Sequence, residues 1–185
     1  MFRRTCLQSA IAVALLAAPV NIQAQQMGAM SDSDYVGKIK AAAPASVVSG
    51  ATIVQAQKDG TMRTLQTGSN GFTCMVAGAN DAMCADSNAM DWARAWMTHS
   101  APPDKVGFVY MLGGDNGASN TDPYATAAAA DNHWVKTGPH VMIVGPTAKT
   151  MGYPATPDAD PTKPYVMWAG TPYAHVMIPV STPPQ

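Results

Sequence analysis

Proline divides the last quarter of this chain into short segments. From residue 139 onward, 10 of the 47 residues are proline, and each proline removes a backbone donor and blocks a helix interior. Long helices are therefore excluded, and the apolar runs at 140–144, 165–168 and 175–180 suit short β-strands. We expect three strands here and irregular chain over most of 145–164.

Turn signals divide the first half of the chain in the same way. Apolar and β-branched runs at 51–57, 62–67 and 72–77 predict three more strands. Asp59-Gly60 separates the first two runs and Asn70-Gly71 the last two. These pairs are typical of two-residue hairpin turns in which both positions take a positive φ. The sequence therefore predicts an antiparallel meander.

Two segments favour helices. Residues 87–98 follow a capping residue at Asp86, and 123–130 is an alanine-rich run that begins at a proline. The first segment has an apolar stripe, formed by Ala89, Ala93, Trp96 and Met97. A further strand is expected over 106–112. The predicted fold class is α+β: a single compact domain over 46–185, with roughly seven short, mostly antiparallel strands, two helices and a Pro-rich C-terminal region.

The segment 1–24 is predicted to be a cleaved signal peptide. Arg3 and Arg4 precede an apolar run over 6–20, and a small residue stands before the expected cut. The run is shorter than the ~20 apolar residues of a membrane span, so we expect no span once the signal is removed. The mature protein would be periplasmic or secreted and would begin with a flexible lead-in over 25–45.

Cys74 and Cys84 are the cysteines that remain when Cys6 is lost with the signal. Two cysteines close in sequence in an exported chain favour a disulfide bond. A redox pair and two metal thiolates are the alternatives. Nine residues lie between the two cysteines, whereas redox motifs hold them two residues apart.

The charged residues exclude several functions. Loss of Arg3 and Arg4 leaves nine basic residues against 12 acidic ones, a net charge of −3. No basic surplus is then present to bind a nucleic-acid backbone. All 12 acidic residues are aspartate, which excludes the HExxH zinc motif and the EF-hand loop with its closing glutamate.

Histidine and methionine recur together in two of the predicted strands. The segment His-Val-Met-Ile starts at His140 and again at His175. Residues i and i+2 of a strand share a face, so Met142 lies beside the first imidazole and Met177 beside the second. Imidazole and thioether are ligands for a soft ion such as Cu(I). If the two strands pair, these four side chains predict a copper site in a small exported binding protein.

Other interpretations of the same residues stay open at this point. Methionine also fills irregular core space, so both segments are compatible with plain buried strands. Zinc or copper(II) could instead bind a set formed by Asp131, His133, His140 and His175. The loop 115–122 is dense in oxygen ligands and is a candidate for calcium, although its spacing matches no calcium loop.

Two functions without a metal are also considered. The first is a periplasmic hydrolase in which Asp131 and His133 form an acid–base pair and Ser119 is the nucleophile, although the chain lacks Gly-x-Ser-x-Gly. The second is a non-catalytic interaction module that presents an exposed aromatic patch to a protein partner. Its aromatic residues would be Tyr153, Tyr165, Trp168 and Tyr173.

Four stretches resemble a group of small exported bacterial proteins of unassigned function. They are Asn70-Gly71-Phe72-Thr73-Cys74, the loop 113–124, the segment 137–144 (Thr-Gly-Pro-His-Val-Met-Ile-Val) and the segment 164–180. The resemblance covers most of the mature chain. It implies a single exported domain and supplies no activity, cofactor or catalytic residue.

Overall fold

The computed structural model describes residues 30–78 and 81–180. The predicted signal peptide 1–24 and the start of the predicted lead-in lie outside the described residues. Within them the helices are α1 (Asp32–Ile39), α2 (Ala45–Val48), α3 (Ser87–Met97) and the 3-10 turn η1 (Pro146–Lys149). The strands are β1 (Thr52–Ala56), β2 (Met62–Gln66), β3 (Phe72–Ala77), β4 (Asp81–Asp86), β5 (Gly107–Met111), β6 (Ala118–Ser119), β7 (Trp134–Val135), β8 (His140–Val144), β9 (Tyr165–Met167) and β10 (His175–Pro179).

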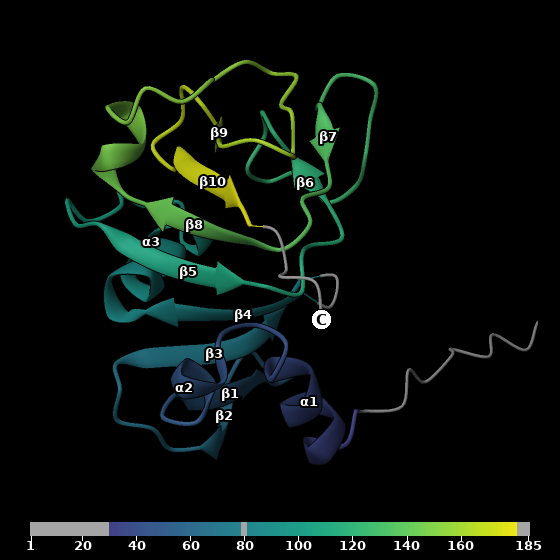
Figure 1. Cartoon of the computed structure of the whole chain (residues 1–185), viewed down its shortest axis with the longest axis vertical. Coiled ribbons are helices and arrows are strands. Elements are labelled where there is room, and N and C mark those ends of the chain that lie inside the picture. Colours follow the sequence, from purple (N-terminus) through teal and green to yellow (C-terminus); the bar gives the residue numbers. More distant parts are fainter. Residues whose placement is uncertain (1–29, 79–80, 181–185) are drawn as a thin grey trace, which may run out of the picture.

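Eight of these strands form one sheet in the order β2-β1-β3-β4-β5-β8-β10-β9, and β6 pairs with β7 apart from it. Figure 1 shows the order rising from β2 at the bottom to β9 at the top, with α1 and α2 beside the lower strands. The α+β class and the mostly antiparallel pairing are confirmed. The sheet is larger than expected, and the described residues contain three α-helices instead of two.

The predicted meander is wrong in its last step. β3 pairs with β1, parallel to it, instead of with β2. Residues 62–64 of β2 are exposed, whereas β3 carries the fully buried Cys74. An exposed strand fits the edge of a sheet and a strand with a buried centre fits its interior. The chain therefore crosses from the edge to the far side of β1.

The first hairpin turn also differs from the prediction. Lys58, Asp59 and Gly60 form a three-residue loop, closed by a hydrogen bond from Gln57 N–H to Thr61 O. Among the non-strand positions of this turn, only Gly60 takes a positive φ, at 83°. The loop thus has the three-residue form with a glycine at its left-handed position.

The described part of the lead-in is packed against the sheet and is not a flexible segment. Tyr35 and Ile39 of α1 are buried. The Tyr35 hydroxyl donates to Val54 O of β1 at 2.8 Å and accepts from Val76 N–H of β3 at 2.8 Å. This hydroxyl ties α1 to two strands, so the domain begins well before residue 46.

Helix α3 begins where predicted, and Asp86 accepts the backbone N–H of Ala89 at 2.8 Å. Its buried face is formed by Ala89, Trp92 and Ala95, whereas Met97 is 64% exposed. The predicted stripe was therefore rotated around the helix. A close approach between α3 and β5 explains the difference. A Cβ on Gly107 of β5 would stand 2.3 Å from Ala89 N, so the side of α3 that carries Ala89 faces the sheet.

The helix predicted over 123–130 does not form. Residues 126–131 are all exposed and form irregular chain, bends and turns. A short helix in water gains most of its stability by burying an apolar face, and this alanine run has no such face.

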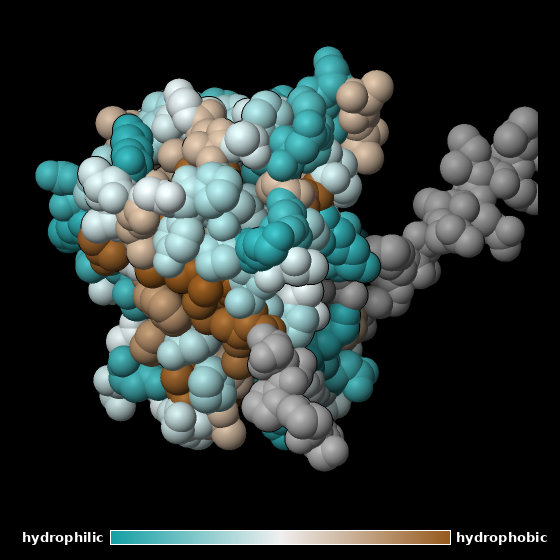
Figure 2. All heavy atoms as spheres, turned by 45° about the horizontal axis from the view of Figure 1, so that its top comes forward, coloured by the Kyte–Doolittle hydropathy of each residue, from teal (hydrophilic) through white to brown (hydrophobic). Residues whose placement is uncertain are grey.

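The two faces of the sheet carry different cores. α1 and α2 cover one end of one face, around Ile53, Cys74 and Cys84, and η1 covers its other end, around Val176. Several apolar side chains between them stay half-buried, and Figure 2 shows hydrophobic residues gathered in a band across this side of the molecule. The other face, which we call the α3 face, is covered by α3 and by the β6–β7 hairpin with its flanking loops.

The predicted disulfide is present between Cys74 and Cys84, which are opposite each other on β3 and β4. Disulfides persist in oxidising compartments, so this bridge is compatible with an extracytoplasmic protein. Within residues 30–78 and 81–180, no helix has the length and apolar character needed to cross a membrane.

We expect the variant Cys74→Ala/Cys84→Ala to lose about 3 kcal/mol of unfolding free energy, because its unfolded chain regains the entropy of a closed loop of this size. Urea unfolding followed by circular dichroism measures the loss. Reduction of the wild-type protein with a phosphine should produce a similar loss. Equal stability of the oxidised and reduced forms would contradict this account of the bridge.

Candidate functional site

The α3 face contains a cavity of about 620 Å³. Strands β5, β8, β10 and β9 form its floor, and the chain over 115–126 and β7 form its cover. The residues that line it include six His and Met side chains of the floor: Met111, His140, Met142, Met167, His175 and Met177. All four side chains of the predicted copper site are therefore brought to one cavity.

Strand register explains why these six side chains are contiguous. β8 and β10 pair antiparallel with Met142 opposite Met177. On one side of this pair, Met111 of β5 is opposite His140. On the other side, Met167 of β9 is opposite His175. Directly opposed side chains have Cβ atoms about 4.5–5.5 Å apart, so the six form one continuous row, which we call the His/Met strip.

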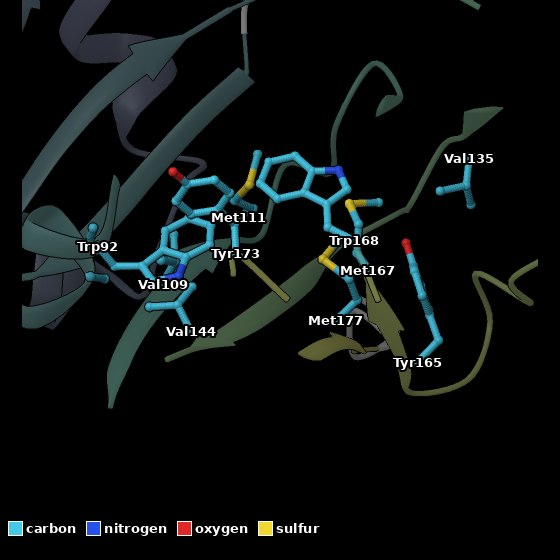
Figure 3. Packing of buried hydrophobic residues seen from close by; sticks show 12 residues of the cluster. Trp92, Val109, Met111, Val135, Val144, Tyr165, Met167, Trp168, Tyr173 and Met177 are labelled. Atoms are coloured by element: carbon cyan, nitrogen blue, oxygen red, sulfur yellow. The ribbon is translucent and has the colours of Figure 1, made fainter. Parts of the chain in front are cut away.

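Figure 3 shows part of this arrangement from close by. The thioethers of Met111, Met167 and Met177 lie in one cluster with the ring of Trp168. Met142 is only partly buried and packs against the same cluster. The sulfur atoms are thus gathered on one face and are not scattered through the core.

Both imidazoles of the strip are held in the same way. His140 Nδ1 lies 2.7 Å from Gly138 O, and His175 Nδ1 lies 3.0 Å from Tyr173 O. A carbonyl oxygen only accepts hydrogen bonds, so Nδ1 carries the proton in each ring and Nε2 keeps its lone pair. Histidine ligands of metals commonly have this arrangement, with the second ring nitrogen donating to a backbone carbonyl.

Burial keeps both rings neutral. Loss of hydration lowers the pKa of His140 below its ordinary value, and it lowers the pKa of His175 to about 4. The charge of Asp115 acts in the opposite direction on His140, and its effect is smaller than that of burial. A neutral imidazole has the free lone pair that a ligand or a hydrogen-bond donor requires.

The two histidines differ in what surrounds Nε2. His140 is fully buried, and its Nε2 is a buried atom without a hydrogen-bond partner in the described structure. The His175 ring is packed edge-on against Trp92 and Trp168, with centroid distances of 5.3 and 4.8 Å. His140 is therefore the ring whose lone pair most needs a partner, because an unsatisfied buried polar atom costs free energy.

The histidines stand at opposite ends of the β8–β10 ladder. His140 is opposite Pro179, and His175 is opposite Val144. Four residues of strand separate the two positions, which is about 13 Å. Metal–nitrogen bonds are only about 2 Å long. The compact two-His, two-Met arrangement expected from the sequence is therefore replaced by an extended row with one histidine near each end.

Asp115 faces His140 from the cover of the cavity. Its Oδ1 accepts the backbone N–H groups of Gly117 and Thr137, each at 2.9 Å. Its Oδ2 lies 4.0 Å from His140 Nε2, which is too long for a hydrogen bond. Burial is the main cause that raises the pKa of Asp115, and the two backbone donors oppose it.

The residues proposed for a hydrolase do not come together. His133 Nδ1 pairs with Asp158 Oδ1 at 2.8 Å and lines a separate, smaller cavity, whereas Asp131 is exposed. The Ser119 hydroxyl donates to Asn132 O and accepts the N–H groups of two loop residues. Its hydrogen-bonding capacity is occupied by backbone, so it holds the loop in shape.

The zinc or copper(II) set and the exposed aromatic patch are also wrong. Among the described residues, no group of three or more His, Cys, Asp or Glu side chains could hold a metal ion, which removes the zinc or copper(II) set. In the loop 115–122, Asp115 and Ser119 bond backbone groups of the loop itself. The proposed exposed aromatic patch is absent from the described surface, because Tyr165, Trp168 and Tyr173 are each at most 7% exposed.

Sequence reasoning missed Met111, Met167 and Asp115. Met111 and Met167 join the strip only through the register of β5 with β8 and of β9 with β10. Asp115 appeared only within an oxygen-rich loop, and nothing in its spacing pointed to His140. Neither a protein-family model, nor a curated protein, nor a solved structure matches this chain.

The burial of His175 predicts that the folded protein becomes less stable as the pH is lowered. Between the ordinary histidine pKa of about 6.5 and the folded value of about 4, the unfolded chain binds a proton that the folded chain does not. The unfolding free energy should therefore decrease as the pH falls from 6.5 to 4, by at most about 3 kcal/mol from this residue. Urea titrations across that range measure it.

The matched variant is His175→Asn, whose amide nitrogen can still donate near the position of Nδ1. The difference between wild type and variant isolates His175 from the aspartates, which titrate in the same range. A difference that does not change with pH would contradict the assignment.

Proposed function

We propose that this protein is an exported carrier that binds Cu(I) in the His/Met strip. The ligand set is His140 Nε2 with the thioethers of Met111, Met142 and Met177. The observation that carries the proposal is the register of β5, β8 and β10, which brings these side chains to one cavity.

The chemistry of the side chains favours a soft monovalent ion. Thioethers and imidazole are neutral donors, and copper(I) accepts such ligands, whereas magnesium and calcium prefer oxygen. Sulfur comes here from methionine, because Cys74 and Cys84 are bonded to each other. Methionine keeps its donor ability in an oxidising compartment, where free thiols would form disulfides.

His140 supplies the nitrogen because of its neighbours. Met111 is directly opposite it on β5, and Met142 is two residues along its own strand on the same face. Met177 lies on the diagonal, about 7–8 Å away between Cα atoms and within the reach of a long side chain. His175 lies against two tryptophan rings and stands near the other end of the strip.

The proposal includes export to the periplasm or beyond the cell. The disulfide supports this location, since structural disulfides are rare in the cytoplasm. The N-terminal segment has the charged start and apolar run of a signal peptide.

Cu(I) binding is tested by competition with a coloured Cu(I) chelator in ascorbate, which keeps copper reduced without supplying a thiol. The variant Met142→Leu/Met177→Leu keeps side-chain volume and removes two sulfur atoms. We expect its Cu(I) affinity to fall at least about tenfold. Met97→Leu is the matched control, because Met97 is 64% exposed on α3 and away from the cavity.

A second pair of variants tests the nitrogen ligand. His140→Asn keeps a donor near the Nδ1 position and removes Nε2, and it should lower the affinity by at least about tenfold. His175→Asn should have a smaller effect. Wild-type affinity in both His140→Asn and the double leucine variant would refute the proposed site.

Export predicts a particular mass. Protein collected from the periplasm of a bacterial host should lack residues 1–24 and should be lighter by two hydrogen atoms than its reduced form. Intact mass spectrometry before and after reduction checks both. Protein that stays in the cytoplasm with its full N-terminus would contradict the proposed location and leave the copper test unaffected.

A further inference from the structure

The cavity is much larger than a metal ion requires. Its volume of about 620 Å³ lies within the range of about 300–1,000 Å³ that is usual for pockets that hold small organic ligands. The strip accounts only for the floor. The walls include aromatic and acidic side chains that lie outside the proposed copper ligand set.

The acidic side chains set the charge of the ligand. Asp81, Asp115 and Asp122 line the cavity, and none of the described residues that line it is a lysine or arginine. A cavity whose charged lining residues are all acidic and whose other walls are largely apolar favours a positively charged ligand.

The Asp115–His140 pair sets the hydrogen-bonding groups of the ligand. Asp115 Oδ2 accepts no hydrogen bond from the described part of the chain, and its side chain is 10% exposed. His140 Nε2 is fully buried and has no partner there either. These two acceptors are 4.0 Å apart. A ligand nitrogen about 2.9 Å from each acceptor can donate one hydrogen to Asp115 Oδ2 and another to His140 Nε2. A hydroxyl group has only one hydrogen and can satisfy only one of them.

The aromatic walls are suited to the same cation. Trp96, Trp134 and Trp168 line the cavity. Hydrogen bonds hold the orientation of two of them: Trp168 Nε1 donates to Ser119 O at 2.8 Å, and Trp96 Nε1 donates to Pro123 O at 3.1 Å. Indole faces attract ammonium groups and also pack against an apolar body.

We propose that the cavity binds a primary ammonium ion with an apolar body, whose nitrogen donates to Asp115 Oδ2 and His140 Nε2. The body of the ligand lies against the tryptophan rings and the thioethers. This inference does not depend on copper binding, because Asp115 and the aromatic walls are outside the proposed copper ligand set. The two guests compete for the lone pair of His140, and the thioethers that would bind copper only pack against the apolar body of the ammonium ligand.

The test uses copper-free, disulfide-bonded protein and calorimetric titration at pH 7.5. The probes are phenethylammonium, its neutral isostere phenethyl alcohol and the anion hydrocinnamate. We expect phenethylammonium to bind at least about tenfold more tightly than the alcohol, and hydrocinnamate not to bind. Equal affinity for ammonium and alcohol, or no binding of ammonium, overturns the proposal. This comparison needs no variant, so it stands even if a substitution prevents folding.

The variant Asp115→Asn removes the charge and should weaken phenethylammonium binding at least about tenfold. Asp104→Asn, at an exposed position outside the cavity, is the matched control and should not change it. Unchanged binding by a folded Asp115→Asn protein also overturns the proposal.

The same variants separate this proposal from copper binding. Met142→Leu/Met177→Leu should keep phenethylammonium affinity within about threefold while losing Cu(I). Asp115→Asn should keep Cu(I) affinity within about threefold while losing phenethylammonium. Loss of both ligands in both variants would show a general collapse of the cavity and would overturn the ammonium assignment.

Discussion

The antiparallel pairing of β8 with β10 is the interaction on which the site depends. The two strands carry the same four residues, His-Val-Met-Ile, and are separated by more than 30 positions in the chain. Because Met142 is opposite Met177, every His and Met of both segments points to the α3 face. A shift of one residue would turn all of them to the opposite face. Ile143, Val176 and Ile178, which now pack in the cluster with Ala148 of η1, would then point into the cavity.

The site carries an energetic cost that the rest of the fold must cover. Two neutral imidazoles are buried, one carboxylate beside them is half-buried, and one imidazole nitrogen has no partner in the described structure. Such groups reduce stability unless a ligand or another polar atom meets them. The disulfide between β3 and β4 cross-links the sheet from its other face, and the α3 helix packs against the α3 face with Trp92 stacked on Trp168. Unsatisfied buried polarity of this kind is typical of sites shaped for function.

Sequence patterns predicted the elements that are determined by residues close together in the chain. Proline and glycine bound the short strands over 140–144, 165–168 and 175–180 on both sides, which made them predictable. The disulfide was predicted from two cysteines in a chain expected to be exported. The predictions were wrong where contacts with residues far away in the sequence determine the local structure. β3 lies beside β1 because its buried centre needs neighbours on both sides. The alanine run 123–130 stays irregular because nothing in the fold offers it an apolar contact.

The sequence by itself determined which atoms are available: soft donors in two strands, a bonded pair of cysteines, acids without glutamate, and no surplus of basic residues. Only the tertiary structure decided which of them meet. Register placed Met111 beside His140 and spaced the two histidines along a row. The cover loop brought Asp115 to face a ring that lies 25 positions further along the chain. The physical reason is that strand pairing and loop closure are long-range events, whereas sequence patterns report on neighbours along the chain.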